Sequence, residues 1–153
     1  MATRKSEDNE RLIDRDLTAL AREGKLSPAH GVDAAVSEVL GLLTRGGKHP
    51  LLSGEPGVGK SALVQEVARR IAEGRGDTLP QALCPTALWW IELAPLGDTD
   101  SLATSVAHVV GVGLPGRRAS FEELAAALDS HRWMLVLDNC EHLVDQVAEL
   151  CRH

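Results

Sequence analysis

Apolar residues recur at helical spacing along most of the chain, which predicts a series of amphipathic helices. The first contains Leu12 and Leu17 and ends near Gly24. The second has Asp33 as its N-cap and is closed by Gly46 and Gly47. The same spacing predicts further helices over residues 60–73, 101–110, 121–128 and 143–150, with Ser120 and Glu123 forming a capping box.

Short apolar runs lie between these helices and predict β-strands over residues 50–53, 87–93 and 133–138. The second and third runs are almost continuously apolar, as strands of a parallel sheet are when both faces are buried. Trp89, Trp90 and Trp133 lie in these runs and are expected in the core. Alternating strands and helices predict an α/β fold with a parallel sheet. We assign residues 1–16 to a polar tail and the start of the first helix, and residues 17–153 to one domain.

The composition narrows the class of protein. The 153 residues include 16 Lys and Arg against 22 Asp and Glu, so a net charge of −6 argues against a general nucleic-acid surface. The apolar share of 44% supplies a core, and no apolar run reaches the roughly 18 to 20 residues of a membrane helix. The N-terminus has no secretory signal pattern, so we expect a cytoplasmic protein. Cys84, Cys140 and Cys151 are expected to be free buried thiols.

The segment Gly54–Ser61, with sequence GEPGVGKS, matches the P-loop pattern GxxxxGK followed by Ser or Thr. It falls between a predicted strand and a predicted helix, which is the context that the motif requires. Lys60 is expected to reach phosphate oxygens and Ser61 to bind Mg²⁺. The alternative is a Gly-rich turn followed by a solvated Lys. The residues predicted to surround the nucleotide are Gly54, Glu55, Pro56, Gly57, Val58, Gly59, Lys60, Ser61 and Ala62.

Asp138 ends the apolar run MLVLD, which is typical of a Walker B strand. We expect its carboxylate to bind Mg²⁺ together with Ser61, although Asp138 could instead cap the following helix. Hydrolysis also needs a group that orients or deprotonates water, and the amide of Asn139 is not a base. Glu141 is the nearest substitute in the sequence. It could equally be an acidic residue that stabilises the N-terminus of the next helix.

Cys140, His142, Cys151 and His153 form two Cys-x-His pairs, which raises a zinc alternative. Residues two apart on a helix point to different faces, so the spacing favours a buried Cys and an exposed His instead. His30, His49, His108 and His131 stand singly and are expected on loops or helix surfaces.

The first half of the chain resembles the first ATPase module of Clp-type AAA+ unfoldases. The resemblance covers residues 17–83, with AREGKLSP, KHPLLSGEPGVGKSALVQEVARRIAEG and LPQAL. The chain departs from that family at Val32, where the family has Arg in a Gly-Arg-Asp stretch. This substitution affects the contacts expected on the adenine side.

Residues 87–150 resemble the nucleotide-binding domain of STAND regulators, which are NB-ARC-like switches. The matching segments are ALWWIELAPLGDTDSLATSVAHVVGV and LVLDNCEHLVDQVAEL. Asp138 and Asn139 form the acid-Asn pair typical of these switches, whereas AAA+ motors have Glu at the position of Asn139.

Together the resemblances imply a three-layer P-loop core that binds ATP or ADP with Mg²⁺, within a larger AAA+ or STAND ATPase. Both families carry a further strand after Walker B, and the chain ends before it, so the sheet is expected to be truncated. We expect a fragment, although a homo-oligomer, a partner or direct pairing of the third strand with the first could complete the sheet.

The function expected from the sequence is ATP binding with Mg²⁺-dependent hydrolysis, with Lys60 and Glu141 as the catalytic residues. Three alternatives remain open: a switch that binds nucleotide with little turnover, a P-loop kinase, and a structural fragment that no longer binds nucleotide.

Overall fold

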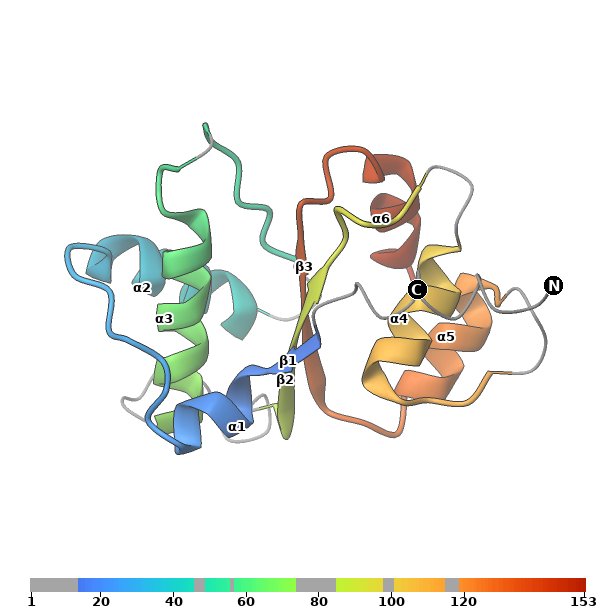
Figure 1. Ribbon diagram of the computed structural model, residues 1–153, viewed down its shortest axis with the longest axis horizontal. Coiled ribbons are helices and arrows are strands. Elements are labelled where there is room, and N and C mark those ends of the chain that lie inside the picture. Colours follow the sequence, from blue (N-terminus) through green and yellow to red (C-terminus); the bar gives the residue numbers. More distant parts are fainter. Residues whose placement is uncertain (1–13, 46–48, 56, 74–84, 98–100, 115–118) are drawn as a thin grey trace, which may run out of the picture. The chain divides into compact units, whose positions relative to one another are not determined.

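The computed structural model describes residues 14–45, 49–55, 57–73, 85–97, 101–114 and 119–153 (Figure 1). Contacts between residues divide the chain into two units, and each is described by itself. One unit consists of Asp16–Leu88, and the other of Met1–Arg15 with Trp89–His153.

The unit Asp16–Leu88 is helical. Helix α1 covers Leu17–Arg22, and Oδ1 of Asp16 caps it by accepting hydrogen bonds from the backbone N–H groups of Thr18 and Ala19. The short strand β1, Asp14–Asp16, precedes the helix. Our prediction that the first helix already contains residues before Leu17 is therefore wrong for residues 14–16, because the cap at Asp16 fixes the helix start. Leu12 lies outside the described residues.

Helices α2, Asp33–Thr44, and α3, Lys60–Glu73, carry the core of this unit. Val36 and Leu40 of α2 pack with Val67 of α3 in a cluster that is at most 4% exposed. Asp33 is the first helical residue and Val32 holds the cap position, so the prediction of Asp33 as N-cap is wrong. Its carboxylate pairs with Arg70 of α3 instead of with the helix backbone. Gly46 and Gly47 lie outside the described residues.

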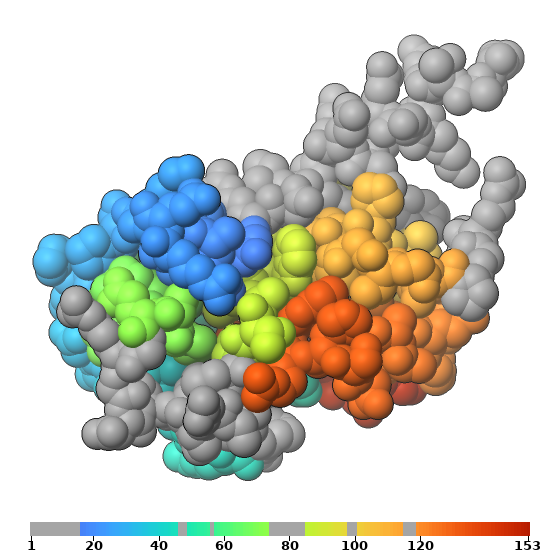
Figure 2. Space-filling model, turned by 90° about the horizontal axis from the view of Figure 1, so that it is seen from below, coloured from blue at the N-terminus to red at the C-terminus, as the bar shows by residue number. Residues whose placement is uncertain are grey.

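The other unit contains strand β3, Trp133–Asp138. It also contains strand β2, Ala87–Glu92, except for its first two residues. Its helices are α4, Leu102–Val110, α5, Phe121–Leu128, and α6, Val144–Leu150. Ser101 caps α4, and Ser120 and Glu123 form the predicted capping box of α5. Figure 2 shows α4 in amber lying against α5 in orange. The core lies between strands and helices and includes five residues that are 0% exposed: Ile91, Leu93, Leu102, Val106 and Leu124.

The described strands form one sheet in the order β1-β2-β3, with β2 and β3 parallel (Figure 1). The backbone N–H of Leu93 donates to the carbonyl of Asp138 at 2.9 Å, which fixes the register at the carboxyl ends of β2 and β3. Trp133, Leu135 and Leu137 pack on the core, as the period of two in a strand requires. All six residues of β3 are only half-buried, so the prediction of a fully buried third strand is wrong.

The predicted strand over residues 50–53 is absent: the segment between His49 and Glu55 has no regular secondary structure. Leu51, an apolar residue of the predicted strand, is 81% exposed. The run is short, and Pro50 has no N–H to donate to a neighbouring strand. Strand formation depends on a partner strand, and apolar composition over four residues does not specify one.

The α/β fold class with a parallel β2–β3 pair is confirmed. Within the described residues, no helix has the length and apolar character needed to cross a membrane.

Candidate nucleotide-binding site

The P-loop residues form a Gly-rich turn that leads directly into α3. Gly57 and Gly59 have φ angles of 82° and 95°, which L-residues with a Cβ rarely adopt. Lys60 is the first residue of α3, so the backbone N–H groups of the first turn face the loop. Glycine-dependent bends followed by a helix N-terminus are the elements from which a phosphate site is built.

The side chain of Lys60 folds back over this loop. Its Nζ donates to the carbonyl oxygen of Gly54 at 2.5 Å and to that of Glu55 at 3.4 Å. The backbone N–H of Val58 also donates to the carbonyl of Glu55 at 3.4 Å, which closes the turn. A Cβ on Gly54 would lie 3.2 Å from Cγ2 of Val58, so the turn has little room for a side chain there. The ammonium group is thus held beside the loop by neutral carbonyls, which a phosphate oxygen can replace.

The other predicted phosphate-binding residues are accessible. Ser61 and Ala62, in the first turn of α3, are exposed, and Val58 is 63% exposed at the loop. Pro56 lies outside the described residues. The structure therefore brings Lys60 together with Gly54 and Glu55 and leaves the Ser61 hydroxyl exposed, as a phosphate and its metal ion require.

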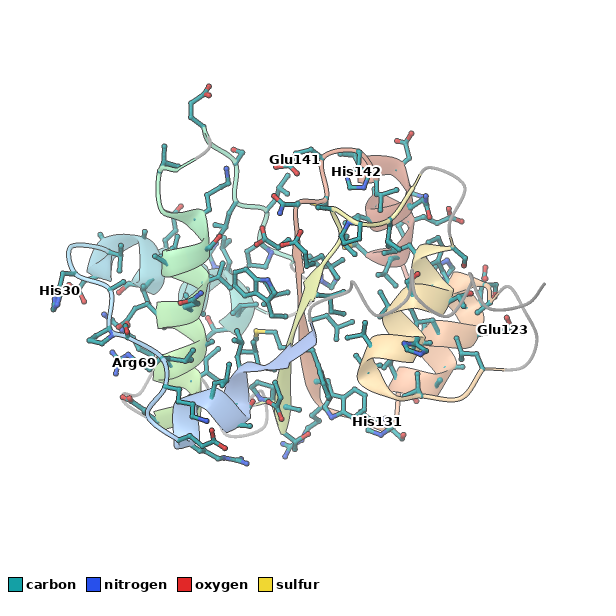
Figure 3. The ribbon with its side chains drawn as sticks, in the orientation of Figure 1. His30, Arg69, Glu123, His131, Glu141 and His142 are labelled. Carbon is teal, nitrogen blue, oxygen red and sulfur yellow. The ribbon has the colours of Figure 1, made fainter. Side chains whose placement is uncertain are left out.

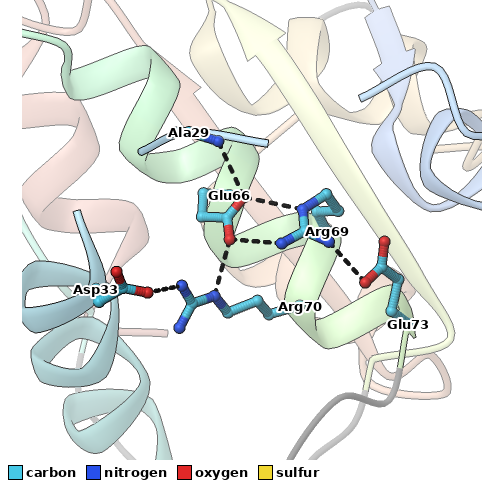
Figure 4. A network of polar contacts seen from close by, with 6 residues as sticks. All are labelled: Ala29, Asp33, Glu66, Arg69, Arg70 and Glu73. Atoms are coloured by element: carbon cyan, nitrogen blue, oxygen red, sulfur yellow. Dashed lines mark hydrogen bonds and ion pairs between the residues drawn. The ribbon is translucent and has the colours of Figure 1, made fainter. Parts of the chain in front are cut away.

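A buried ion-pair network stabilises α3 (Figure 4). Glu66 is 1% exposed and accepts hydrogen bonds from Arg69, Arg70 and the backbone N–H of Ala29. These contacts, above all those from Arg69, lower the pKa of Glu66 to about 2. The same pairing raises the pKa of both arginines. Because Ala29 lies in the loop before α2 and Asp33 pairs with Arg70, the network fixes that loop and α2 against the helix that begins at the P-loop.

The second predicted motif lies at the carboxyl end of β3. Asp138 is its last residue, and Asn139 follows with a φ of 53°, the left-handed conformation that Asn tolerates better than most residues. The backbone N–H of Asn139 donates to Oδ1 of Asp138 at 3.0 Å. This local bond orients the carboxylate that we predicted as a metal ligand.

Sequence reasoning missed Glu92, which the structure places beside this motif. Oε1 of Glu92 accepts hydrogen bonds from Nδ2 of Asn139 at 2.7 Å and from the backbone N–H of Ala94 at 3.2 Å. Glu92 ends β2 as Asp138 ends β3, so an acidic residue at the end of the apolar run ALWWIE was the available signal.

Glu141 lies in the exposed loop between β3 and α6 (Figure 3). Its neighbour His142 has Nε2 at 2.9 Å from the carbonyl oxygen of Leu96. Burial raises the pKa of the Cys140 thiol, and the charge of Glu141 raises it further. The catalytic assignment of Glu141 remains a prediction.

The two Cys-x-His pairs have separate surroundings. His142 contacts Leu96, whereas Nε2 of His153 lies 3.7 Å from Glu122. Cys140 is half-buried, but Cys151 is exposed just after α6, so the prediction that it is buried is wrong. Cys151 is the C-cap residue of α6 and lies outside the core cluster of its unit. Cys84 lies outside the described residues.

The P-loop and Asp138 belong to different units of the chain, so their joint binding of Mg²⁺ stays a prediction. Within each unit the geometry is defined: Lys60 over its loop in one, and Asp138, Asn139 and Glu92 at the strand ends in the other.

Comparisons with known proteins agree with the first of the two resemblances. Residues 44–153 match the family model of the AAA domain. The chloroplastic chaperone protein ClpB3 of Arabidopsis thaliana is 43% identical over 83 residues, which are 54% of this chain and 8% of the relative. The chaperone protein ClpB of Corynebacterium diphtheriae is 39% identical over 100 residues, or 63% of this chain and 11% of the relative. The chain thus spans only about a tenth of the length of these curated relatives.

Solved structures of Hsp104 from S. cerevisiae share the fold. A complex of Hsp104 with casein aligns with a TM-score of 0.54 and 23% identity, over 90% of this chain and 24% of that one. A complex of Hsp104 with ADP aligns with a TM-score of 0.52 and 22% identity, over 90% of this chain and 28% of that one. The resemblance of residues 87–150 to STAND regulators stays a prediction.

Proposed function

The chain belongs to the AAA domain family, and we propose that its P-loop binds ATP with Mg²⁺ and that the domain hydrolyses the nucleotide. The observation that carries the proposal is the position of Lys60. Its ammonium group lies over a loop bent at glycines with positive φ. Lys60 is also the first residue of a helix of 14 residues. That arrangement combines a positive charge, backbone donors and a helix N-terminus, all of which favour a phosphate group.

Each residue has a role in this proposal. Backbone N–H groups of the segment from Gly54 to Ala62 contact the phosphates, and Lys60 exchanges its carbonyl partners for phosphate oxygens. The hydroxyl of Ser61 and the carboxylate of Asp138 would hold Mg²⁺, which neutralises phosphate charge when bound. The choice of ATP over other nucleotides follows from family membership. The Hsp104 complex with ADP is consistent with it.

The test is the binding of a fluorescent ATP analogue with and without Mg²⁺, with free phosphate measured in the same samples. The wild-type chain is compared with Lys60→Ala and with the control Lys25→Ala, which removes an exposed lysine that pairs with Glu23 after α1. We expect saturable, Mg²⁺-dependent binding that Lys60→Ala weakens at least a hundredfold and Lys25→Ala leaves unchanged. A folded wild-type chain that binds no nucleotide would refute the proposal.

A second candidate function is a switch that holds ATP with little turnover. Asn139 favours it, because the residue after Asp138 is an amide and cannot accept a proton from water. Phosphate release separates the two candidates: binding without release supports the switch, and binding with release supports the ATPase. In this second candidate, the chain is part of a larger STAND-type ATPase. Either candidate is compatible with assembly into a homo-oligomer.

A further inference from the structure

The proposed hydrolysis requires a group that takes a proton from the attacking water, and the residue after Asp138 does not provide one. Asn139 carries a neutral amide, which donates and accepts hydrogen bonds but is not a base at ordinary pH. The structure places a carboxylate directly against that amide. It comes from the neighbouring strand rather than from the segment that follows Asp138.

We propose that Glu92 is the catalytic carboxylate that accepts the proton of the attacking water, and that Asn139 is a positioning residue that orients it. The inference rests on the proposed function, because it assigns a residue to the ATP hydrolysis stated there. Glu92 then takes the role of proton acceptor that the sequence analysis gave to Glu141.

Glu92 and Asp138 end neighbouring strands of the sheet. The hydrogen bond from the N–H of Leu93 to the carbonyl of Asp138, at 2.9 Å, sets the ends of β2 and β3 side by side. Glu92 therefore lies at the same carboxyl edge as Asp138, and open α/β sheets bind their ligands at this edge. Glu141, by contrast, lies in the exposed loop beyond the strand.

Two hydrogen bonds hold the carboxylate of Glu92. Oε1 of Glu92 accepts from Nδ2 of Asn139 at 2.7 Å and from the N–H of Ala94 at 3.2 Å. Both donors are neutral amides. They fix the direction of the side chain at the carboxyl end of β2.

The backbone of Asn139 has a left-handed conformation. Its φ of 53° and the hydrogen bond from its N–H to Oδ1 of Asp138 turn the chain sharply after β3. In this conformation one residue contacts the predicted metal ligand through its backbone and Glu92 through its side chain. Asn139 thus links the two carboxylates.

In the proposed step, water attacks ATP in line with the bond that breaks. A water oxygen forms a bond to the γ-phosphorus of ATP while the bond from that phosphorus to the β–γ bridging oxygen breaks, and the bridging oxygen keeps the electron pair. Glu92 accepts one proton of the water and later releases it to solvent or phosphate. The products are ADP and inorganic phosphate.

The decisive variant is Glu92→Gln, because the Gln carbonyl oxygen can still accept from Asn139 and Ala94 while the base is lost. We expect phosphate release to fall at least a hundredfold, in line with the usual contribution of a general base. Binding of the fluorescent ATP analogue should stay within twofold and the melting temperature should be unchanged. The control Glu149→Gln removes an exposed acid on α6 in the same unit and should leave all three measurements unchanged.

The role of Asn139 has its own readout. Asn139→Ala should lower kcat and leave KM for ATP nearly unchanged, since it misplaces the base without touching the phosphate loop. Loss of turnover in Glu141→Gln but not in Glu92→Gln would overturn the inference and leave the ATPase intact. A wild-type chain that binds ATP without releasing phosphate would also overturn it. Absence of ATP binding would refute the proposed function itself.

Discussion

The guanidinium group of Arg69 donates to both carboxylate oxygens of Glu66, at 2.9 and 2.6 Å, one turn apart on α3. Glu66 is 1% exposed, whereas the side chain of Arg69 is 17% exposed. A buried carboxylate would be costly without such partners, and here it also binds Arg70 and the loop before α2. The helix that presents Lys60 to the P-loop is thereby tied to the rest of its unit.

Glu66→Ala should lower the free energy of unfolding by about 3 kcal/mol, because it leaves Arg69 and Arg70 without their buried partner. Urea denaturation followed by circular dichroism measures the change. The control is Glu73→Gln on the same helix, whose more exposed pair with Arg69 should contribute less than about 1 kcal/mol. Equal losses in the two variants would contradict the network's importance.

The stability of the protein should depend on Glu66 at acid pH. The folded pKa of about 2 lies below the ordinary value of 4.5, so its stabilisation is fully present above pH 4.5 and is lost as pH falls toward 2. The difference corresponds to about 3 kcal/mol. Urea midpoints of wild type and Glu66→Gln, measured at several pH values across this range, should converge as the pH falls. A constant gap between them would argue against the lowered pKa.

Gly59→Ala should weaken nucleotide binding about tenfold. At a φ of 95° an alanine is strained by about 1 to 3 kcal/mol, although a Cβ would meet no atom within 4 Å. Titration with the fluorescent ATP analogue measures the loss. The matched control is Gly41→Ala within α2, where open space and helical backbone predict unchanged binding and a gain in stability of about 0.5 to 1 kcal/mol. Unaltered affinity in Gly59→Ala would show that the loop does not need this conformation.

Asn139→Ala and Asn139→Gly should separate backbone strain from the loss of the amide. Both remove the hydrogen bond to Glu92, but only alanine is strained at a φ of 53°. We expect the alanine variant to be less stable than the glycine variant by about 1 kcal/mol in urea denaturation. Identical stabilities would indicate that the turn relaxes when the side chain is changed.

Local sequence determined much of the secondary structure. Helix α3 and the capping box of Ser120 with Glu123 are predicted from residues no more than a few positions apart. The same holds for β2 and β3, whose apolar runs end in acids. These features depend on hydrogen bonds and steric preferences within one or two turns, so the sequence specifies them directly.

The strand predicted over residues 50–53 failed for the opposite reason. A strand needs a partner elsewhere in the chain, and the pairing that formed instead joins Asp14–Asp16 to β2. Apolar residues such as Leu51 do not by themselves select that partner.

The candidate site divides in the same way. The P-loop is predictable from the sequence, because glycine spacing, Lys60 and the helix start act within one short segment. The contact of Glu92 with Asn139 across 47 positions of the chain, and that of Ala29 with Glu66 across 37, arise from folding in three dimensions. Such contacts depend on strand register and helix packing, which are set by the whole fold and not by neighbouring residues.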